Sequence, residues 1–303
     1  MSYRTLLLII LAAPLLLLGG AAALGVRIPV PQWGRDYVLR FAFEESAAPL
    51  ELPPIEGPDD PARPLVVIDA GHGGRDPGAV GTDGTGRRLQ EKDITLAIAL
   101  ALRDELLRQG GIRVALTRAD DRILPLAHRP EIARRLDADL FISVHADSAG
   151  ELADVSGASI YTLSDEASSE AAARFAAREN DADRLNGITI EGTSAAVSTI
   201  LVELSQQRTQ EDALAFAALV LREGEGALTF VPQPQRAAGL AVLRAPDVPS
   251  VLFESGFVTN RDDSARLATP EGRARYAAVL ARAIRVYFAR RAPVEAGAGA
   301  GGE

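Results

Sequence analysis

Three apolar segments of this chain each run directly into an ionisable side chain. The segment LVVIDAGHGG leads to His72, LFISVHAD leads to His145, and SVLFESGF leads to Glu254. In an open α/β sheet, ligands bind outside the carboxyl ends of the strands, where the connecting loops converge. The chain has only three histidines, so we expect two of them to meet an acid at one edge of a sheet.

Glycines flank the first of these histidines. Gly71, Gly73 and Gly74 bracket His72 and allow the backbone to turn sharply, which brings the imidazole close to a bulky or charged group. An ordinary turn is the alternative interpretation. A glycine-rich loop after a first strand also suggests phosphate binding, but GHGGRDPG fits neither the dinucleotide-binding fingerprint nor the Walker pattern.

A third metal ligand is available at Glu91, which lies just ahead of an expected helix in the segment LQEKD. A carboxylate near a helix start is commonly only a partner of the helix dipole. Two imidazoles and one carboxylate are nevertheless the ligands of a catalytic zinc site with one position open to water. They also suit a non-haem iron oxygenase, but an exported protein has no easy supply of the reductant. The sequence therefore favours one Zn²⁺ held by His72, Glu91 and His145.

Glu254 is then the candidate general base. Zinc lowers the pKa of bound water from about 15.7 to about 7, and a nearby carboxylate can take the proton. Returning that proton to a leaving amine completes a general acid–base cycle, which contributes about 10²–10⁴-fold to the rate. A buried, salt-bridged acid is the alternative for Glu254. Asp69 and Asp147 adjoin the ligands and are candidates either to orient them or to serve packing and turns. His128 is expected to be a surface or supporting residue.

Short apolar runs alternate with longer helical patterns, which is typical of an α/β fold with parallel strands. One helix is expected after Asp93, as its N-cap, and ends at Gly110-Gly111. The last helix is expected to open at Thr269-Pro270, and two more helical segments lie between Ser164 and Glu223. Six strands are expected, at Leu65–Asp69, Ile112–Leu116, Leu140–Val144, Ser159–Leu163, Ala241–Leu243 and Ser250–Phe253.

The composition is that of a folded chain, with 47% hydrophobic and 24% charged residues among 303. The chain has no cysteine, which excludes disulfides, thiolate metal ligands and cysteine nucleophiles. Its formal net charge of −9 disfavours binding to nucleic acid or to an anionic membrane surface.

Residues 1–26 have the layout of a secretory signal peptide. Arg4 provides a positive flank, the apolar run Leu6–Leu18 follows, and Ala21 and Ala23 are placed as at a cleavage site. A retained membrane anchor is the alternative, because Leu6–Val26 is uncharged and long enough to span a bilayer. Either segment would carry the rest of the chain across the inner membrane, so we expect a periplasmic protein of a Gram-negative bacterium.

A single domain is expected over residues 64–291. Residues 27–63 form an expected linker, in which only Tyr37–Phe43 alternates like a strand, and residues 292–303 form an expected disordered tail.

At these residues the sequence resembles the zinc-dependent N-acetylmuramoyl-L-alanine amidases (the amidase_3 family) of the bacterial cell-division type. The resemblance covers essentially all of residues 65–290, in order, through the segments VVIDAGHGGRDPGAVG, LQEKDITLAIA, TRADDRILPLAHR, ADLFISVHAD and GLAVLRAPDVPSVLFESGFVTN. It implies a twisted, mostly parallel six-stranded sheet flanked by helices. It places the zinc ligands of the family on His72, Glu91 and His145, and its catalytic glutamate on Glu254.

The implied reaction is hydrolysis of the amide between N-acetylmuramic acid and L-alanine in peptidoglycan during septal wall splitting. Two alternatives remain: a zinc carboxypeptidase or endopeptidase acting on stem peptides, and a catalytically silent wall-binding regulator. A segment at about 180–210 resembles the regulatory insertion of the division enzymes, with Glu191 and Glu203 as candidate regulatory acids. The resemblance therefore also implies relief of autoinhibition by a periplasmic activator of metallopeptidase-like fold. The β-rich targeting domain that division amidases often carry has no counterpart beyond Tyr37–Phe43.

Overall fold

The structure, a computed structural model, describes residues 50–148, 154–185 and 199–291, without the side chains of 184–185 and 199–206. These residues all belong to one compact unit, Leu39–Glu303. The expected signal segment 1–26, the strand-like piece Tyr37–Phe43 and the tail 292–303 lie outside the described residues. Among the helices that the structure describes, none is both long and apolar enough to cross a membrane.

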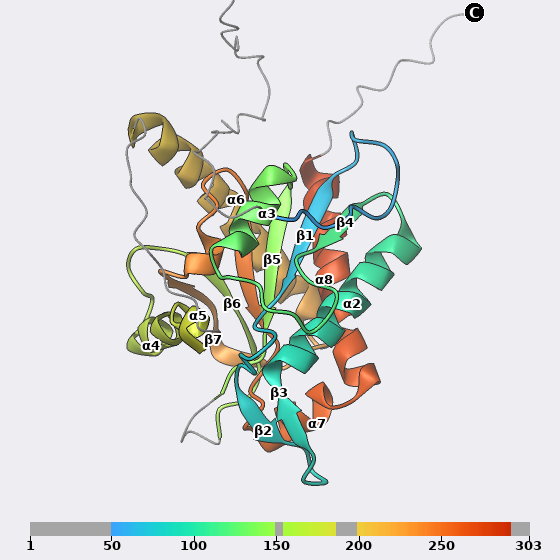
Figure 1. Cartoon of the computed structure of the whole chain (residues 1–303), viewed down its shortest axis with the longest axis vertical. Helices are drawn as coiled ribbons and strands as arrows, with labels where there is room; N and C mark the ends of the chain where they lie inside the picture. Colours follow the sequence, from blue (N-terminus) through green and yellow to red (C-terminus); the bar gives the residue numbers. More distant parts are fainter. Residues whose placement is uncertain (1–49, 149–153, 186–198, 292–303) are drawn as a thin grey trace, which may run out of the picture. The chain divides into compact units, whose positions relative to one another are not determined.

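A six-stranded sheet forms the centre of the unit, in the strand order β4-β1-β5-β8-β6-β7 (Figure 1). Strands β4, β1, β5 and β8 are parallel to one another, β6 runs antiparallel to β8, and β7 pairs parallel with β6. The predicted α/β fold with a mostly parallel six-stranded sheet is therefore confirmed. The strands are β1 (Leu65–Ala70), β4 (Arg113–Leu116), β5 (Leu140–His145), β6 (Ala158–Leu163), β7 (Phe230–Ala238) and β8 (Ser250–Glu254).

Helices cover both faces of this sheet, which explains why its central strands are apolar on both sides. In β1, Val66 and Ile68 belong to one buried cluster, whereas Leu65 and Val67 belong to another on the opposite face. The first cluster is completed by α2 (Glu91–Gln109), α6 (Thr199–Gly224), α7 (Arg261–Leu267) and α8 (Pro270–Arg291). The second is completed by α3 (His128–Arg135), α4 (Glu170–Glu179) and the short 3₁₀ helix η1 (Ala241–Leu243). The short helix α5 (Ala182–Leu185) comes after α4.

The sixth strand is not where the sequence predicted it. Ala241–Leu243, expected as a strand, forms η1, and the sheet is instead completed by β7 (Phe230–Ala238). The strand β7 contains two prolines, Pro232 and Pro234, which argue against a strand in the sequence because proline cannot donate a ladder hydrogen bond. They are tolerated because β7 lies at the edge of the sheet, where one side of the strand needs no partner.

The first long helix begins earlier than expected. α2 starts at Glu91 rather than after Asp93, and the side chain of its N-cap residue Gln90 makes no capping hydrogen bond. The first backbone N–H groups are satisfied instead by the preceding loop, since Glu91 donates to the Ala79 carbonyl at 2.9 Å and Lys92 to the Pro77 carbonyl at 3.1 Å. The predicted end at Gly110 is confirmed, and at α8 the Thr269 hydroxyl accepts from the Gly272 N–H at 3.1 Å, as a cap does.

A small hairpin precedes α2 and was not predicted. It is formed by β2 (Val80–Thr82) and β3 (Arg88–Gln90), and Figure 1 shows it beside α7. A Cβ atom on Gly81 would lie 2.0 Å from the Val258 carbonyl oxygen, so the hairpin packs closely on the loop after β8. Because β3 continues directly into α2, the hairpin fixes the position of the first residue of that helix.

Candidate metal centre

The carboxyl ends of three neighbouring strands bring the predicted residues together. His145 is the last residue of β5 and lies directly opposite Glu254, the last residue of β8, in the strand register. His72 comes two residues after β1, on the other side of β5. The rule that parallel strands gather their ligands at one edge therefore holds for these three residues.

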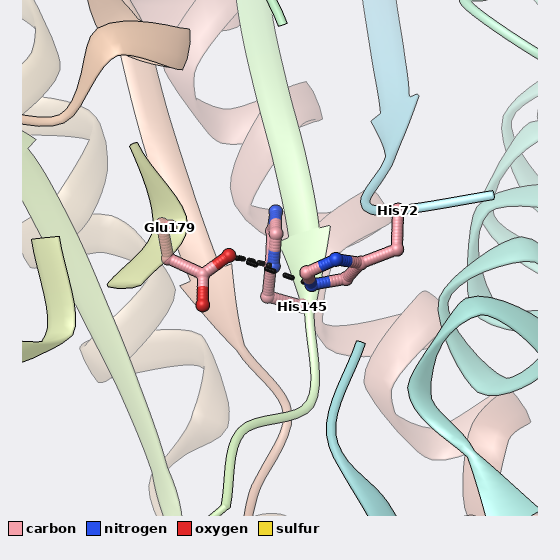
Figure 2. Close-up of side chains that lie close together, drawn as sticks. All are labelled: His72, His145 and Glu179. Atoms are coloured by element: carbon pink, nitrogen blue, oxygen red, sulfur yellow. Dashed lines mark ion pairs between the residues drawn. The ribbon is translucent and has the colours of Figure 1, made fainter. Parts of the chain in front are cut away.

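The two imidazoles and two carboxylates converge through single atoms. The Glu91 Oε1 oxygen lies 3.1 Å from His72 Nε2 and 3.0 Å from His145 Nδ1. The Glu179 Oε2 oxygen lies 3.4 Å from each of the same two nitrogens. Figure 2 shows the Glu179 carboxylate pointing at both rings from the end of α4. All four side chains are buried.

This arrangement suits a divalent cation. In the part of the chain that the structure describes, His72 Nε2 is buried and makes no aligned hydrogen bond, although Glu91 Oε1 lies 3.1 Å away. The donor atoms of His72, His145 and Glu179 lie within 4.8 Å of one another, as ligands of one ion do. Imidazole nitrogens with carboxylate oxygens are the donors of catalytic zinc sites, so these residues fit that metal.

Glu91 and Glu179 occupy different positions in this group. Glu91 is fixed through both oxygens of its carboxylate, because Oε1 accepts from the Ala146 N–H at 2.9 Å and Oε2 from the Ala79 N–H at 2.8 Å. Burial by itself raises the pKa of Glu91, but the facing histidines hold that pKa well below its usual value. The two histidines therefore favour the charged form of the Glu91 carboxyl. The sequence pointed to Glu91, whereas Glu179 was not predicted at all.

A further carboxylate supports His72 from behind. The Asp76 Oδ2 oxygen lies 2.7 Å from His72 Nδ1, and Asp76 Oδ1 accepts from the Gly78 N–H at 2.9 Å. An acceptor on the far nitrogen of an imidazole fixes the ring and directs its other nitrogen toward a metal. Asp76 was not predicted, although the spacing of four residues in HGGRD is a sequence signal that could have indicated it.

Glu254 lies beside the group with one oxygen held and one oxygen unpaired. Its Oε2 accepts from the Asp147 N–H at 2.9 Å, whereas its buried Oε1 has no partner among the described residues. Burial raises the pKa of Glu254 well above its usual value, and the nearby acids Asp147 and Glu91 add to this rise. A carboxyl group in this position can hold a proton at Oε1 and release it again.

Asp69 and Asp147, the candidates to orient the ligands, have other partners. The Asp69 carboxylate accepts from Thr117, Ser143 and Arg129. The Asp147 carboxylate pairs with Arg178, next to Glu179. Of the two roles open to them, these contacts favour packing and turns, and the orienting role for His72 belongs to Asp76.

The remaining predicted residues lie outside this group. His128 is the first residue of α3 and is half-buried. Glu191 lies outside the described residues, and Glu203 lies in the part of α6 whose side chains are not described. Their regulatory role stays a prediction.

Comparison with known proteins gives a consistent relationship. Residues 66–286 match the family described as N-acetylmuramoyl-L-alanine amidase (Amidase_3). The chain is 35% identical over 250 residues to AmiC of Escherichia coli O6:H1, covering 82% of this chain and 58% of AmiC. It is 36% identical over 225 residues to AmiA of Salmonella typhimurium, covering 74% of this chain and 76% of AmiA.

Solved structures agree. The amidase AmiC2 of Nostoc punctiforme superimposes with a TM-score of 0.52 at 30% identity, covering 75% of this chain and 98% of AmiC2. The family match over residues 66–286 includes nearly all of the central sheet and the site residues His72, Glu91, His145, Glu179 and Glu254. The chain belongs to the N-acetylmuramoyl-L-alanine amidase family.

Proposed function

We propose that this protein is a zinc-dependent N-acetylmuramoyl-L-alanine amidase. Its reaction would be hydrolysis of the amide that joins N-acetylmuramic acid to L-alanine of the peptidoglycan stem peptide. The observation that carries the proposal is the convergence of His72 Nε2 and His145 Nδ1 on Glu91 Oε1, at 3.1 and 3.0 Å, with Glu254 opposite His145 in the sheet. Membership of the family supports the choice of the amide bond as the one cleaved, and the geometry of the site supports the roles of the four side chains.

The ion would be held by His72, Glu91 and His145. When bound, zinc supplies Lewis acidity toward both the amide carbonyl and water. The Asp147 N–H holds Oε2 of Glu254 and leaves Oε1 to exchange protons. Glu254 then takes a proton from the attacking water and returns it to the L-alanine nitrogen as the carbon–nitrogen bond breaks, so one carboxyl serves as base and then as acid.

Digestion of purified sacculi tests this function. Zinc-loaded protein should release intact stem peptides and leave glycan strands without peptides, as seen by mass spectrometry. Trimmed peptides would point instead to a carboxypeptidase or endopeptidase. Binding without any release would point to a wall-binding regulator.

The same geometry supports an autoinhibited resting form. With Glu179 present, four protein donors surround the site, whereas catalytic zinc keeps one position open to water. Helix α4 is held in this place by the stack of Phe175 on Tyr161, with ring centroids 4.6 Å apart, and by the Arg178–Asp147 ion pair. We infer that Glu179 caps the metal, and that a periplasmic activator of metallopeptidase-like fold removes it.

Substitution of Glu179 distinguishes an inhibitory cap on the metal from a ligand that activity requires. Glu179→Ala should increase the basal rate of sacculus digestion without activator, because a water position opens. The neighbouring variant Glu170→Ala, at the exposed start of α4, serves as control and should keep the wild-type rate. A loss of activity in Glu179→Ala would make Glu179 a required ligand and not a cap.

We further propose that the protein acts in the periplasm during separation of daughter cells. This proposal rests on residues 1–26 and on the similarity to AmiA and AmiC. Fractionation of cells should recover, in the periplasm, a protein that lacks its N-terminal signal segment, because a cleaved signal peptide is absent from the mature chain. Recovery of the full-length chain in the membrane fraction would support the anchor alternative.

A further inference from the structure

His72 adopts a backbone conformation that its residue type disfavours. Its φ is +60°, in the left-handed region, and only Asp137 shares this among the described non-glycine residues. The next two residues, Gly73 and Gly74, also have positive φ, so three consecutive residues turn the chain back toward the site. A left-handed non-glycine residue persists only when its surroundings fix it.

One buried guanidinium on α3 contacts both sides of this turn. Arg129 Nη2 donates to the His72 carbonyl at 2.9 Å, and Nη1 donates to the Ala70 carbonyl at 2.8 Å. Nη1 also lies 2.9 Å from Asp69 Oδ1, so the buried positive charge has a partner. The Arg129 side chain is 6% exposed. Its planar, multiply donating head therefore bridges the end of β1 and the strained residue.

A second buried guanidinium, that of Arg118, contacts the backbone between the end of β1 and His72. Arg118 Nη2 donates to the Gly71 carbonyl at 2.8 Å, and Arg118 Nε donates to the Ala70 carbonyl at 2.9 Å. The carbonyl groups of three consecutive residues, 70 to 72, thus all accept from arginine. Burying two like charges side by side is costly unless they satisfy specific acceptors, and here the acceptors belong to the loop that carries His72.

We propose that Arg129 is a positioning residue for the metal centre: it fixes the left-handed conformation of His72 and so directs Nε2 at the ion. The proposal rests on the metal-binding part of the proposed function and not on the substrate. Without this guanidinium, His72 is free to relax to an ordinary conformation, in which the ring no longer meets Glu91 and His145.

Zinc affinity of the full chain tests the proposal. Loss of groups that orient a ligand typically lowers metal affinity by about 10–100-fold, and we expect a loss of that size in Arg129→Met, measured by competition with a chromogenic chelator. The visible spectrum of the Co²⁺-substituted variant should also change, because one ligand has moved. Arg129→Lys, which keeps a charge beside Asp69 but fewer donors, should give an intermediate loss and serves if the Met variant does not fold.

The matched control is Arg134→Met, on the same helix. The Arg134 side chain is 10% exposed, and it pairs with Asp247 at 3.0 Å and with Glu131 at 2.7 Å. Neither acid belongs to the loop at 70–72. We expect this variant to lose thermal stability and to keep the wild-type zinc affinity and Co²⁺ spectrum.

Two results would overturn the proposal. One is an Arg129 variant with unchanged zinc affinity and Co²⁺ spectrum. The other is a fall in zinc affinity that is equal in the Arg129 and Arg134 variants at equal loss of stability, which would make Arg129 a purely structural residue. Because both readouts use the metal alone, a wild-type protein that binds zinc but fails to cleave sacculi would contradict the amidase proposal and leave this one standing.

Discussion

At the scale of single residues, the proposed mechanism gives Glu254 and the two histidines His72 and His145 separable roles. Glu254 is held through Oε2 by the Asp147 N–H, and its Oε1, unpaired among the described residues, is available for proton transfer. His72 and His145 each direct a ring nitrogen at the Glu91 carboxylate. Substitutions should therefore divide into those that remove proton transfer and those that remove the metal.

Glu254→Gln should lose about 10²–10⁴-fold in activity while keeping zinc. The reason is that the glutamine side chain fills the same space but cannot take a proton from the attacking water. The measurement is sacculus digestion together with metal content of the same preparation. Near-normal turnover in this variant would remove Glu254 from the mechanism.

His145→Ala should lose the zinc itself, since it removes a donor that lies 3.0 Å from Glu91 Oε1. The third histidine provides the matched control, because His128 lies at the start of α3 and outside the site. Metal content after gel filtration should be near zero in His145→Ala and unchanged in His128→Ala. Equal zinc in both variants would contradict the ligand assignment.

At the scale of elements, the β2–β3 hairpin positions Glu91 and depends on one aspartate. Asp83 accepts from the backbone N–H groups of Thr85 and Arg87 and pairs with the Arg87 side chain at 3.0 Å. A hydrogen bond from the Thr85 side chain, helped by these backbone contacts, lowers the pKa of Asp83 to about 2. The carboxylate therefore organises the turn in its charged form.

The lowered pKa of Asp83 determines how the stability of the hairpin changes with pH. A carboxyl whose pKa is lower in the folded state stabilises the fold above its unfolded pKa of 3.8 and loses that contribution as the pH falls through about 2. Hydrogen-exchange protection of the Thr85 and Arg87 amides should fall as the pH is lowered from 3.8 to about 2. The Asp83→Ala variant should lack this protection even at higher pH, because it has no carboxylate to accept from these amides. Asp104→Ala, an exposed residue on α2, should leave the hairpin protected. Equal protection in Asp83→Ala and wild type would show that the turn does not need the carboxylate.

At the scale of the whole molecule, metal binding should stabilise the folded chain. The proposed ligands His72, Glu91 and His145 come from the loop after β1, the start of α2 and the end of β5, which come together only on folding. An ion that binds only the folded state stabilises it by about 2.7 kcal/mol at 100 times its Kd.

Removal of zinc with a chelator should therefore lower the Tm by about 5–10 °C for a domain of this size. Differential scanning calorimetry with and without added Zn²⁺ measures this shift, and Mg²⁺ serves as the control ion. No shift with Zn²⁺ would contradict a site formed by the folded chain.

The sequence by itself determined the central strands and the ionisable groups at their ends, His72, His145 and Glu254. Apolar runs such as those before His145 and Glu254 must be buried on both faces, and parallel strands place the residues after them at one edge of the sheet. Glu91 was found through the motif and through its place at a helix start. These are local signals, readable within a few residues of each strand or helix.

Tertiary structure alone decided the rest. Glu179 meets His72 from a distant part of the chain, and no local pattern indicates that the end of α4 should return to the ends of β1 and β5. The edge position of β7 made its prolines acceptable, although the same prolines argue against a strand when read in isolation. Asp69, close to the site in sequence, pairs with Arg129 because alternate residues of a strand point to opposite faces. Contacts between distant segments depend on how the elements pack, and that packing is a property of the whole fold.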